Sequence, residues 1–145
     1  MNAEDHTLLV QENRAERFDA VVRALASAKG LLLTAHELAD GDATGSELAL
    51  AQGLATLGKP VWVINNEPLS ARYRFLDPEG RFVRVHEPLS FNQILQDCDT
   101  AVVLDNNDRK RLGKLESALF DERRGLQLVC IDHHRFDEPF CDLHL

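Results

Sequence analysis

The chain has 145 residues, 44% of them hydrophobic, and 24 acidic residues against 16 basic ones give a formal net charge of −8. This balance argues against long duplex nucleic acid as a partner, because a broad basic surface supplies most of the non-specific affinity for phosphates. No run approaches the ~20 apolar residues that span a bilayer, and the polar start is unlike a signal peptide, so the sequence predicts no membrane anchor.

The first part of the chain predicts a helix, a strand and a second helix. Residues 14–29 carry apolar side chains at helical spacing, and those expected to face the core are Phe18, Val21, Val22 and Leu25. Residues 31–35 are all apolar apart from one threonine and predict a strand buried on both faces. Residues 40–45 predict a glycine-bearing loop before the second helix, which Gly58 ends. The residues of that helix expected to face the core are Leu48, Ala51, Leu54, Ala55 and Leu57.

The alternation of strands and helices continues to the end of the chain. The further strands predicted are residues 61–64, 82–85, 101–104 and 126–131. The further helices predicted are residues 91–96 and 112–120, with a short helix near Tyr73 in an otherwise irregular stretch. This order predicts an α/β fold, a doubly wound and mostly parallel sheet with helices on both faces.

Polar side chains directly follow three of the predicted strands. His36 follows the first strand, Asp105 the fourth and Asp132 the fifth. In open α/β sheets, ligands bind outside the carboxyl ends of the strands near a topological switch point. We therefore expect these three strand ends to contribute to one site.

The segment after the first strand has two interpretations. His36, Asp40 and Asp42 could converge on cations, since Gly41 lets the backbone turn tightly between the two carboxylates, and the following helix N-terminus suits an anion. Alternatively, the segment is a solvated acidic turn in which Asp42 or Thr44 caps the helix. The sequence alone leaves both open.

The strand-end residues suggest a metal site. Asp105 is a candidate ligand, although an aspartate that caps a loop is also common there, and Asp132, His133 and His134 place two imidazoles beside a carboxylate. Histidine with carboxylate ligands suits Mn²⁺, Fe²⁺ or Zn²⁺, and the oxygen-rich balance favours Mn²⁺. This number of potential ligands is more than one ion needs. It fits two metal ions about 3.5–4 Å apart that share a carboxylate. Such two-metal sites hydrolyse phosphate esters.

Three segments in order resemble the first three motifs of the DHH phosphoesterase superfamily. They are His36-x-x-x-Asp40-Gly-Asp42-Ala-x-Gly-Ser46, the apolar strand that ends in Asp105, and Asp132-His133-His134. The sequence is most similar to a small cytosolic branch, the bifunctional oligoribonucleases (nanoRNases) that also act as phosphoadenosine-phosphate phosphatases. Further similar segments are Leu57-Gly58-Lys59-Pro60, Arg72-Tyr73-x-Phe75-Leu76 and Asp108-x-x-Arg111-Leu112-Gly113.

The resemblance implies a set of metal ligands. His36 and Asp40 would bind one manganese ion. Asp42 and His133 would bind a second ion, and Asp105 would bridge the two. Mg²⁺, Fe²⁺ and Zn²⁺ are alternatives to Mn²⁺ in such a site.

The resemblance also implies roles for two further residues and a division into domains. Asp132 would orient the ligands, and His134 would be catalytic, stabilising charge on the substrate phosphate or moving a proton. Members of the superfamily carry a fourth metal-binding aspartate and a smaller substrate-binding domain after the double histidine. The residues after His134 match neither, so we expect residues 1–145 to be a DHH-type N-terminal domain that is incomplete at its C-terminal end.

The sequence thus predicts a manganese-dependent phosphoesterase that hydrolyses short oligonucleotides (nanoRNA) or phosphoadenosine phosphate by a two-metal mechanism. Alternatives are a cyclic-dinucleotide phosphodiesterase or single-strand exonuclease of the same superfamily and, from another class, a non-catalytic metal- or nucleotide-binding module. The basic run at residues 109–111 is typical of a solvated helix face and could instead contact substrate phosphate. Three cysteines without a CxxC spacing favour a cytoplasmic protein with reduced thiols, and a homodimer is a further expectation.

Overall fold

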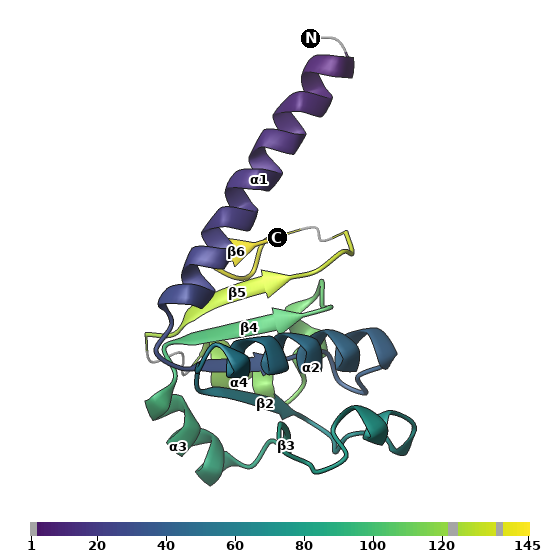
Figure 1. The fold of residues 1–145 in the computed structure, drawn as a ribbon, viewed down its shortest axis with the longest axis vertical. Helices are drawn as coiled ribbons and strands as arrows, with labels where there is room; N and C mark the ends of the chain where they lie inside the picture. The colour runs from purple at the N-terminus through teal and green to yellow at the C-terminus, as the bar shows by residue number, and fades with distance from the viewer. Residues whose placement is uncertain (1–2, 122–124, 136–137) are drawn as a thin grey trace.

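A sheet of six parallel strands, with helices on both faces, forms the described part of the chain (Figure 1). The computed structural model describes residues 3–121, 125–135 and 138–145. The strands are β1 (Leu31–Thr34), β2 (Val61–Asn65), β3 (Val83–Val85), β4 (Thr100–Leu104), β5 (Gln127–Ile131) and β6 (Leu143–His144). The α-helices are α1 (Ala3–Ser27), α2 (Gly41–Thr56), α3 (Pro88–Asp97) and α4 (Leu115–Phe120), and the 3-10 turns are η1 (Ala71–Leu76) and η2 (Arg109–Leu112).

The strand order is β3-β2-β1-β4-β5-β6, which is doubly wound. From β1 the chain builds the sheet outward through β2 and β3, and then returns to the other side of β1 to add β4, β5 and β6. All five strand pairs are parallel, which confirms the predicted α/β class. The switch point lies between β1 and β4, where Leu33 pairs with Val102.

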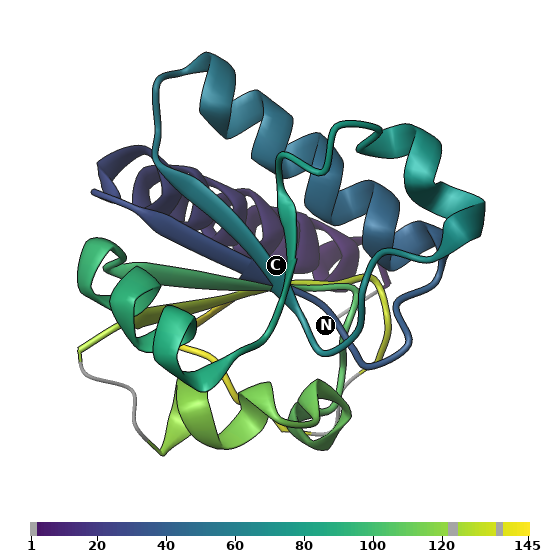
Figure 2. The same ribbon diagram turned by 90° about the horizontal axis from the view of Figure 1, so that it is seen from below.

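The central strands are apolar throughout because both of their faces are covered. Leu31 and Leu33 belong to the core beneath α1 and α2, whereas Leu32 belongs to the core beneath α3, η2 and α4. Figure 2 shows α1 and α2 on one side of the sheet, with α3 and α4 on the other. Successive side chains of a strand point to opposite faces, so an unbroken apolar run is what a sheet between two helical layers requires.

Helix α2 begins earlier than the sequence analysis expected. Asp40 is the N-cap, so residues 41–45 form the first turn of the helix and are not a loop. The expected core positions Leu48, Ala51 and Leu54 are buried, but Ala55 and Leu57 are exposed, and that part of the prediction is wrong. In the last turn of α2, Leu54 still packs in the core, whereas Ala55 and the C-cap residue Leu57 lie on the solvent side.

Helix α1 is longer than predicted and packs on the sheet through its C-terminal half. Val21 is buried, with Ala24 and Ala28 following at helical spacing, but Phe18 and Val22 are exposed and do not face the core as expected. Figure 1 shows that α1 runs past the β6 edge of the sheet and that its N-terminal half projects away from the body. No helix in the described ranges has the length and apolar character needed to cross a membrane.

The other differences from the prediction concern short elements. Helix α4 begins at Leu115, because residues 109–112 form the separate turn η2 with Asp108 as its cap. Strand β6 is only two residues long and was not predicted, since so short a segment has no detectable alternation.

We predict that Leu32→Ala destabilises the fold strongly. Leu32 is 0% exposed at the centre of the sheet, and truncation of a buried leucine to alanine costs about 2–5 kcal/mol. Leu57→Ala is the matched control, because Leu57 is 77% exposed and surface changes usually stay within about 0.5 kcal/mol. Urea unfolding of the two variants measures the difference, and equal unfolding free energies would contradict the assigned core.

Candidate metal centre

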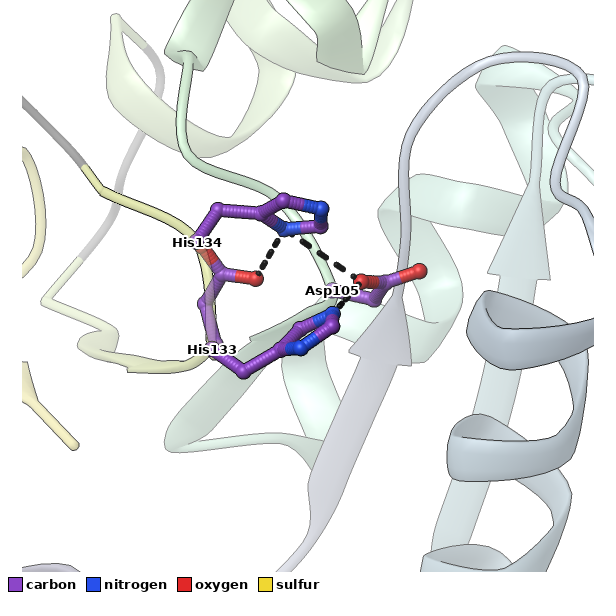
Figure 3. A group of neighbouring side chains, drawn as sticks. Asp105, His133 and His134 are labelled. Carbon is purple, nitrogen blue, oxygen red and sulfur yellow. Dashed lines mark hydrogen bonds and ion pairs between the residues drawn. The ribbon is translucent and has the colours of Figure 1, made fainter.

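The carboxyl ends of β1, β4 and β5 bring the predicted site residues to one edge of the sheet. His36 follows β1 and Asp105 follows β4, and these two strands are direct neighbours at the switch point. The segment from Asp132 to His134 follows β5, the next strand along. In Figure 3, the rings of His133 and His134 lie beside the Asp105 carboxylate.

Asp105 lies at the centre of the cluster. Its φ of +50° lies in the left-handed region, which aspartate tolerates better than most residues, and its backbone N–H donates to the Ile131 carbonyl oxygen at 3.1 Å. Its side chain is 6% exposed, with Oδ1 3.3 Å from His133 Nε2 and 3.5 Å from His134 Nδ1. Oδ2 lies 3.8 Å from His36 Nε2.

The environment of this carboxylate suits a cation. Among the described residues, Asp105 Oδ1 is buried and accepts no hydrogen bond of good geometry, although two ring nitrogens are near it. A buried carboxylate without hydrogen bonds is costly unless an opposite charge compensates it. A bound metal ion would provide that charge.

Two groups of potential ligands share Asp105. In the first, one atom each from His36, Asp40 and Asp105 lie within 4.8 Å of one another. In the second group, one atom each from Asp105, Asp132, His133 and His134 also lie within 4.8 Å of one another. A carboxylate common to two ligand groups is the arrangement that a pair of divalent ions requires.

Asp40 combines helix capping with membership of the first group. Its Oδ1 accepts hydrogen bonds from the backbone N–H groups of Asp42 at 3.0 Å and Ala43 at 3.1 Å, so Asp40, not Asp42 or Thr44, caps α2. The hydrogen bond from Ala43 is the main cause that lowers the pKa of this carboxyl, and the nearby charges of His36 and Arg111 act in the same direction. Asp40 is therefore held ionised, as a metal ligand must be.

His36 is oriented by the backbone. Its Nδ1 lies 2.7 Å from the Glu37 carbonyl oxygen, an acceptor, so Nδ1 carries the proton in this contact. The other nitrogen, Nε2, is then the one that faces Asp105. A histidine that ligates a metal through one nitrogen commonly donates the other N–H in this way.

Asp42 and His133 form the open side of the cluster. Asp42 Oδ2 lies 3.4 Å from His133 Nε2, and these side chains are 62% and 68% exposed. Asp42 is outside both ligand groups and reaches the cluster through His133. Asp42 is therefore the predicted ligand with the weakest connection to the cluster around Asp105.

His134 is fixed by Asp132. Nδ1 of His134 lies 2.7 Å from Asp132 Oδ1, and this hydrogen bond is the main cause that raises the pKa of His134. The contact with Asp132 occupies Nδ1, and the His134 side chain is 42% exposed. The imidazole is therefore oriented, and its protonated form is favoured.

A buried acid that the sequence analysis did not single out lies behind the site. Glu47 in α2 is 0% exposed, and its Oε2 accepts a hydrogen bond from Asn65 Nδ2 at 2.9 Å. Burial raises the pKa of Glu47 to about 7. Its position, one residue before Leu48 on the apolar face of α2, is the sequence signal that could have identified it.

The basic run after β4 divides into two parts. Arg109 forms ion pairs with Glu116 at 2.9 Å and Asp121 at 3.1 Å, so it supports α4 and does not face the cluster. Arg111 accepts a hydrogen bond from the Glu37 backbone N–H at its carbonyl oxygen, 2.8 Å away. Gly113 lets the Glu37 side chain lie close to the backbone after η2. The φ of Gly113 is +56°, and a Cβ at this position would lie 2.2 Å from a Glu37 carboxylate oxygen.

The fold and the cluster define a doubly wound α/β domain with a histidine and carboxylate site at its switch point. A sequence model described as the DHH family, N-terminal domain, matches residues 31–144. The chain therefore belongs to the DHH family, which confirms the resemblance noted in its three motifs.

Two solved structures are similar to the chain. An exopolyphosphatase-related protein from Bacteroides fragilis has a TM-score of 0.79 at 22% identity, over 90% of this chain and 38% of that one. Exonuclease RecJ bound to manganese has a TM-score of 0.48 at 17% identity, over 89% of this chain and 30% of that one. This chain thus spans well under half the length of either protein, and the first comparison supports the fold. No curated protein matches the chain.

The Glu47 carboxyl leads to a pH-dependent prediction. Its folded-state pKa of about 7 exceeds the ordinary value of 4.5, so the folded state retains a proton that the unfolded chain has lost. Its contribution to stability is thus complete below pH 4.5 and is lost as the pH rises through 7. We predict that the parent loses up to roughly 3 kcal/mol more than Glu47→Gln between pH 5 and 8.

Urea unfolding at the two pH values measures this difference. Glutamine preserves the shape of the side chain and can still accept the hydrogen bond from Asn65, so the pair differs mainly in titration. Glu16→Gln, at an exposed position of α1, is the control and should follow the parent. Parallel pH curves for the parent and Glu47→Gln would contradict a neutral buried acid.

Proposed function

We propose that the chain is the metal-binding domain of a manganese-dependent phosphoesterase that hydrolyses short oligonucleotides or phosphoadenosine phosphate by a two-metal mechanism. The observation that supports it most is the buried Asp105 carboxylate, which belongs to both ligand groups. Membership of the DHH family, whose members are phosphoesterases, supports the reaction class.

In this proposal the two ions occupy the two sides of Asp105. His36 and Asp40 hold the first ion, and Asp42 and His133 hold the second. The distances of 3.8 Å from Asp105 to His36 and 3.3 Å to His133 leave room for an ion on each side of the carboxylate. The mixture of carboxylate oxygens with imidazole nitrogens suits Mn²⁺, and Mg²⁺, Fe²⁺ and Zn²⁺ are the alternatives to test.

The chemistry divides between the ions and the protein. Two divalent ions, when bound, would lower the pKa of an attacking water and neutralise charge on the phosphoryl group. His134 presents Nε2 to the substrate phosphate, where its imidazolium stabilises negative charge or supplies a proton to the departing oxygen. Asp132 holds the His134 ring through Nδ1 and so fixes the direction of that proton.

The substrate class is proposed from the residues and from the charge. The segments around Leu57, Tyr73 and Arg111 resemble those of nanoRNases with phosphoadenosine-phosphate phosphatase activity. A net charge of −8 is unsuited to long duplexes but is compatible with a small anion held by metal ions. The three cysteines are free, which supports a cytoplasmic location, and a homodimer is a further part of the proposal.

Full activity is proposed to need residues beyond those in this domain. The Asp42 and His133 side is exposed, so water would screen the charges that stabilise the transition state. The family model that matches the chain describes an N-terminal domain, which supports a contribution from elsewhere in the protein. A non-catalytic metal-binding module is the second candidate, and the weak connection of Asp42 to the cluster favours it.

Hydrolysis assays with an Asp105 variant test the proposal. With Mn²⁺ and the protein in excess over substrate, so that slow turnover is measurable, we expect mononucleotide from a short RNA and phosphate from phosphoadenosine phosphate. Asp105→Asn keeps the shape but removes the shared charge, and should reduce both rates by at least roughly 100-fold. Asp19→Asn, which removes an exposed carboxylate from α1, should leave both rates unchanged. No hydrolysis of either substrate by the parent would favour the binding module.

A further inference from the structure

A large cavity joins the cluster to helix α1. Its volume is ≈ 750 Å³, and one wall contains Asp42, Asp105 and His133. The other wall includes Arg14 and Arg17 of α1. Small-molecule sites typically span roughly 300–1,000 Å³, so the cavity has the size of a nucleotide site.

The two arginines are available to bind an anion. They are three residues apart on one face of α1, and both are exposed. Arg17 Nε donates to the Asn13 carbonyl oxygen at 3.2 Å, and within residues 13–121, 125–135 and 138–145 neither guanidinium forms an ion pair with a carboxylate. Arg14 and Arg17 thus line the same cavity as Asp42 and Asp105, where their guanidinium groups can contact an anion that enters it.

Helix α1 is anchored beside these arginines and adds an apolar side chain to the cavity. One turn beyond Arg17, Val21 is buried in the core and anchors the helix to the sheet. Phe18 lines the same cavity, although it is exposed and takes no part in the core. An exposed aromatic side chain beside cations can stack on a nucleobase while the cations contact phosphate.

We propose that Arg14 and Arg17 bind a second phosphate of the substrate, while the cluster around Asp105 holds the phosphate that is hydrolysed. This inference rests on the proposed function and assigns the residues of this chain that would bind the phosphate that is not hydrolysed. Guanidinium groups bind phosphate through paired, charge-assisted hydrogen bonds, which suits them to this position. Residues 14 and 17 lie outside the segment that matches the DHH family, so α1 supplies a specificity element to the family's metal site.

Binding measurements test the inference without relying on turnover. Calorimetry with Ca²⁺ in place of Mn²⁺, to suppress hydrolysis, would compare adenosine 3′,5′-bisphosphate with adenosine 5′-monophosphate. We expect the parent to bind the bisphosphate roughly tenfold more tightly. The double variant Arg14→Gln/Arg17→Gln should lose this preference and keep its affinity for the monophosphate, which also shows that it is folded. Glutamine is nearly as good a helix former as arginine, so α1 should persist.

A second double variant controls for net charge. Arg23→Gln/Arg84→Gln removes two exposed arginines outside the cavity and should keep the preference. Equal affinities in the parent, no binding of either nucleotide, or an unchanged preference in Arg14→Gln/Arg17→Gln would overturn the inference. Selective binding of the bisphosphate without any hydrolysis in Mn²⁺ would instead contradict the proposed phosphoesterase and leave the second phosphate site in place.

Discussion

The charge of the buried Asp105 carboxylate is the constraint on which the rest of the site depends. At 6% exposure it is largely shielded from water, and ring nitrogens of His36, His133 and His134 lie 3.3–3.8 Å from it. Those distances are too long for strong hydrogen bonds, but they suit side chains arranged around cations. The left-handed backbone at Asp105 turns the chain directly after β4 and so brings this carboxylate into the cluster.

The doubly wound sheet explains why these side chains meet. Parallel strands end on the same edge, and the order β2-β1-β4-β5 makes the ends of β1, β4 and β5 neighbours. Helix α2 is the next element after β1, and one residue of the loop between them, Asp40, both caps the helix and joins the first ligand group. Helix α1 then closes the cavity from the side of β6. The topology of the sheet therefore brings the candidate ligands together, and the proposed phosphate contacts come from a helix that the family match does not include.

The sequence predicted the sheet well, because buried parallel strands are continuous apolar runs, as in residues 31–35, and because Asp105 and Asp132 directly follow such runs. The sequence did not predict features that depend on the position of a residue in the folded structure, such as the burial of one side chain or the choice of a helix cap. Phe18 has helical spacing with Val21 but is 54% exposed, which periodicity within one helix cannot show. The cap at Asp40 was missed because Asp40 and Asp42 are equivalent as capping residues in sequence, and only the hydrogen bonds to Asp42 and Ala43 distinguish them.

The most direct test of the shared carboxylate is a crystal structure of the protein with Mn²⁺, using anomalous scattering to locate the ions. The account predicts two manganese peaks about 3.5–4 Å apart, one on each side of the Asp105 carboxylate. One ion would be near His36 and Asp40, and the other near His133. A single peak, or two peaks of which only one contacts Asp105, would contradict a two-metal centre bridged by this residue.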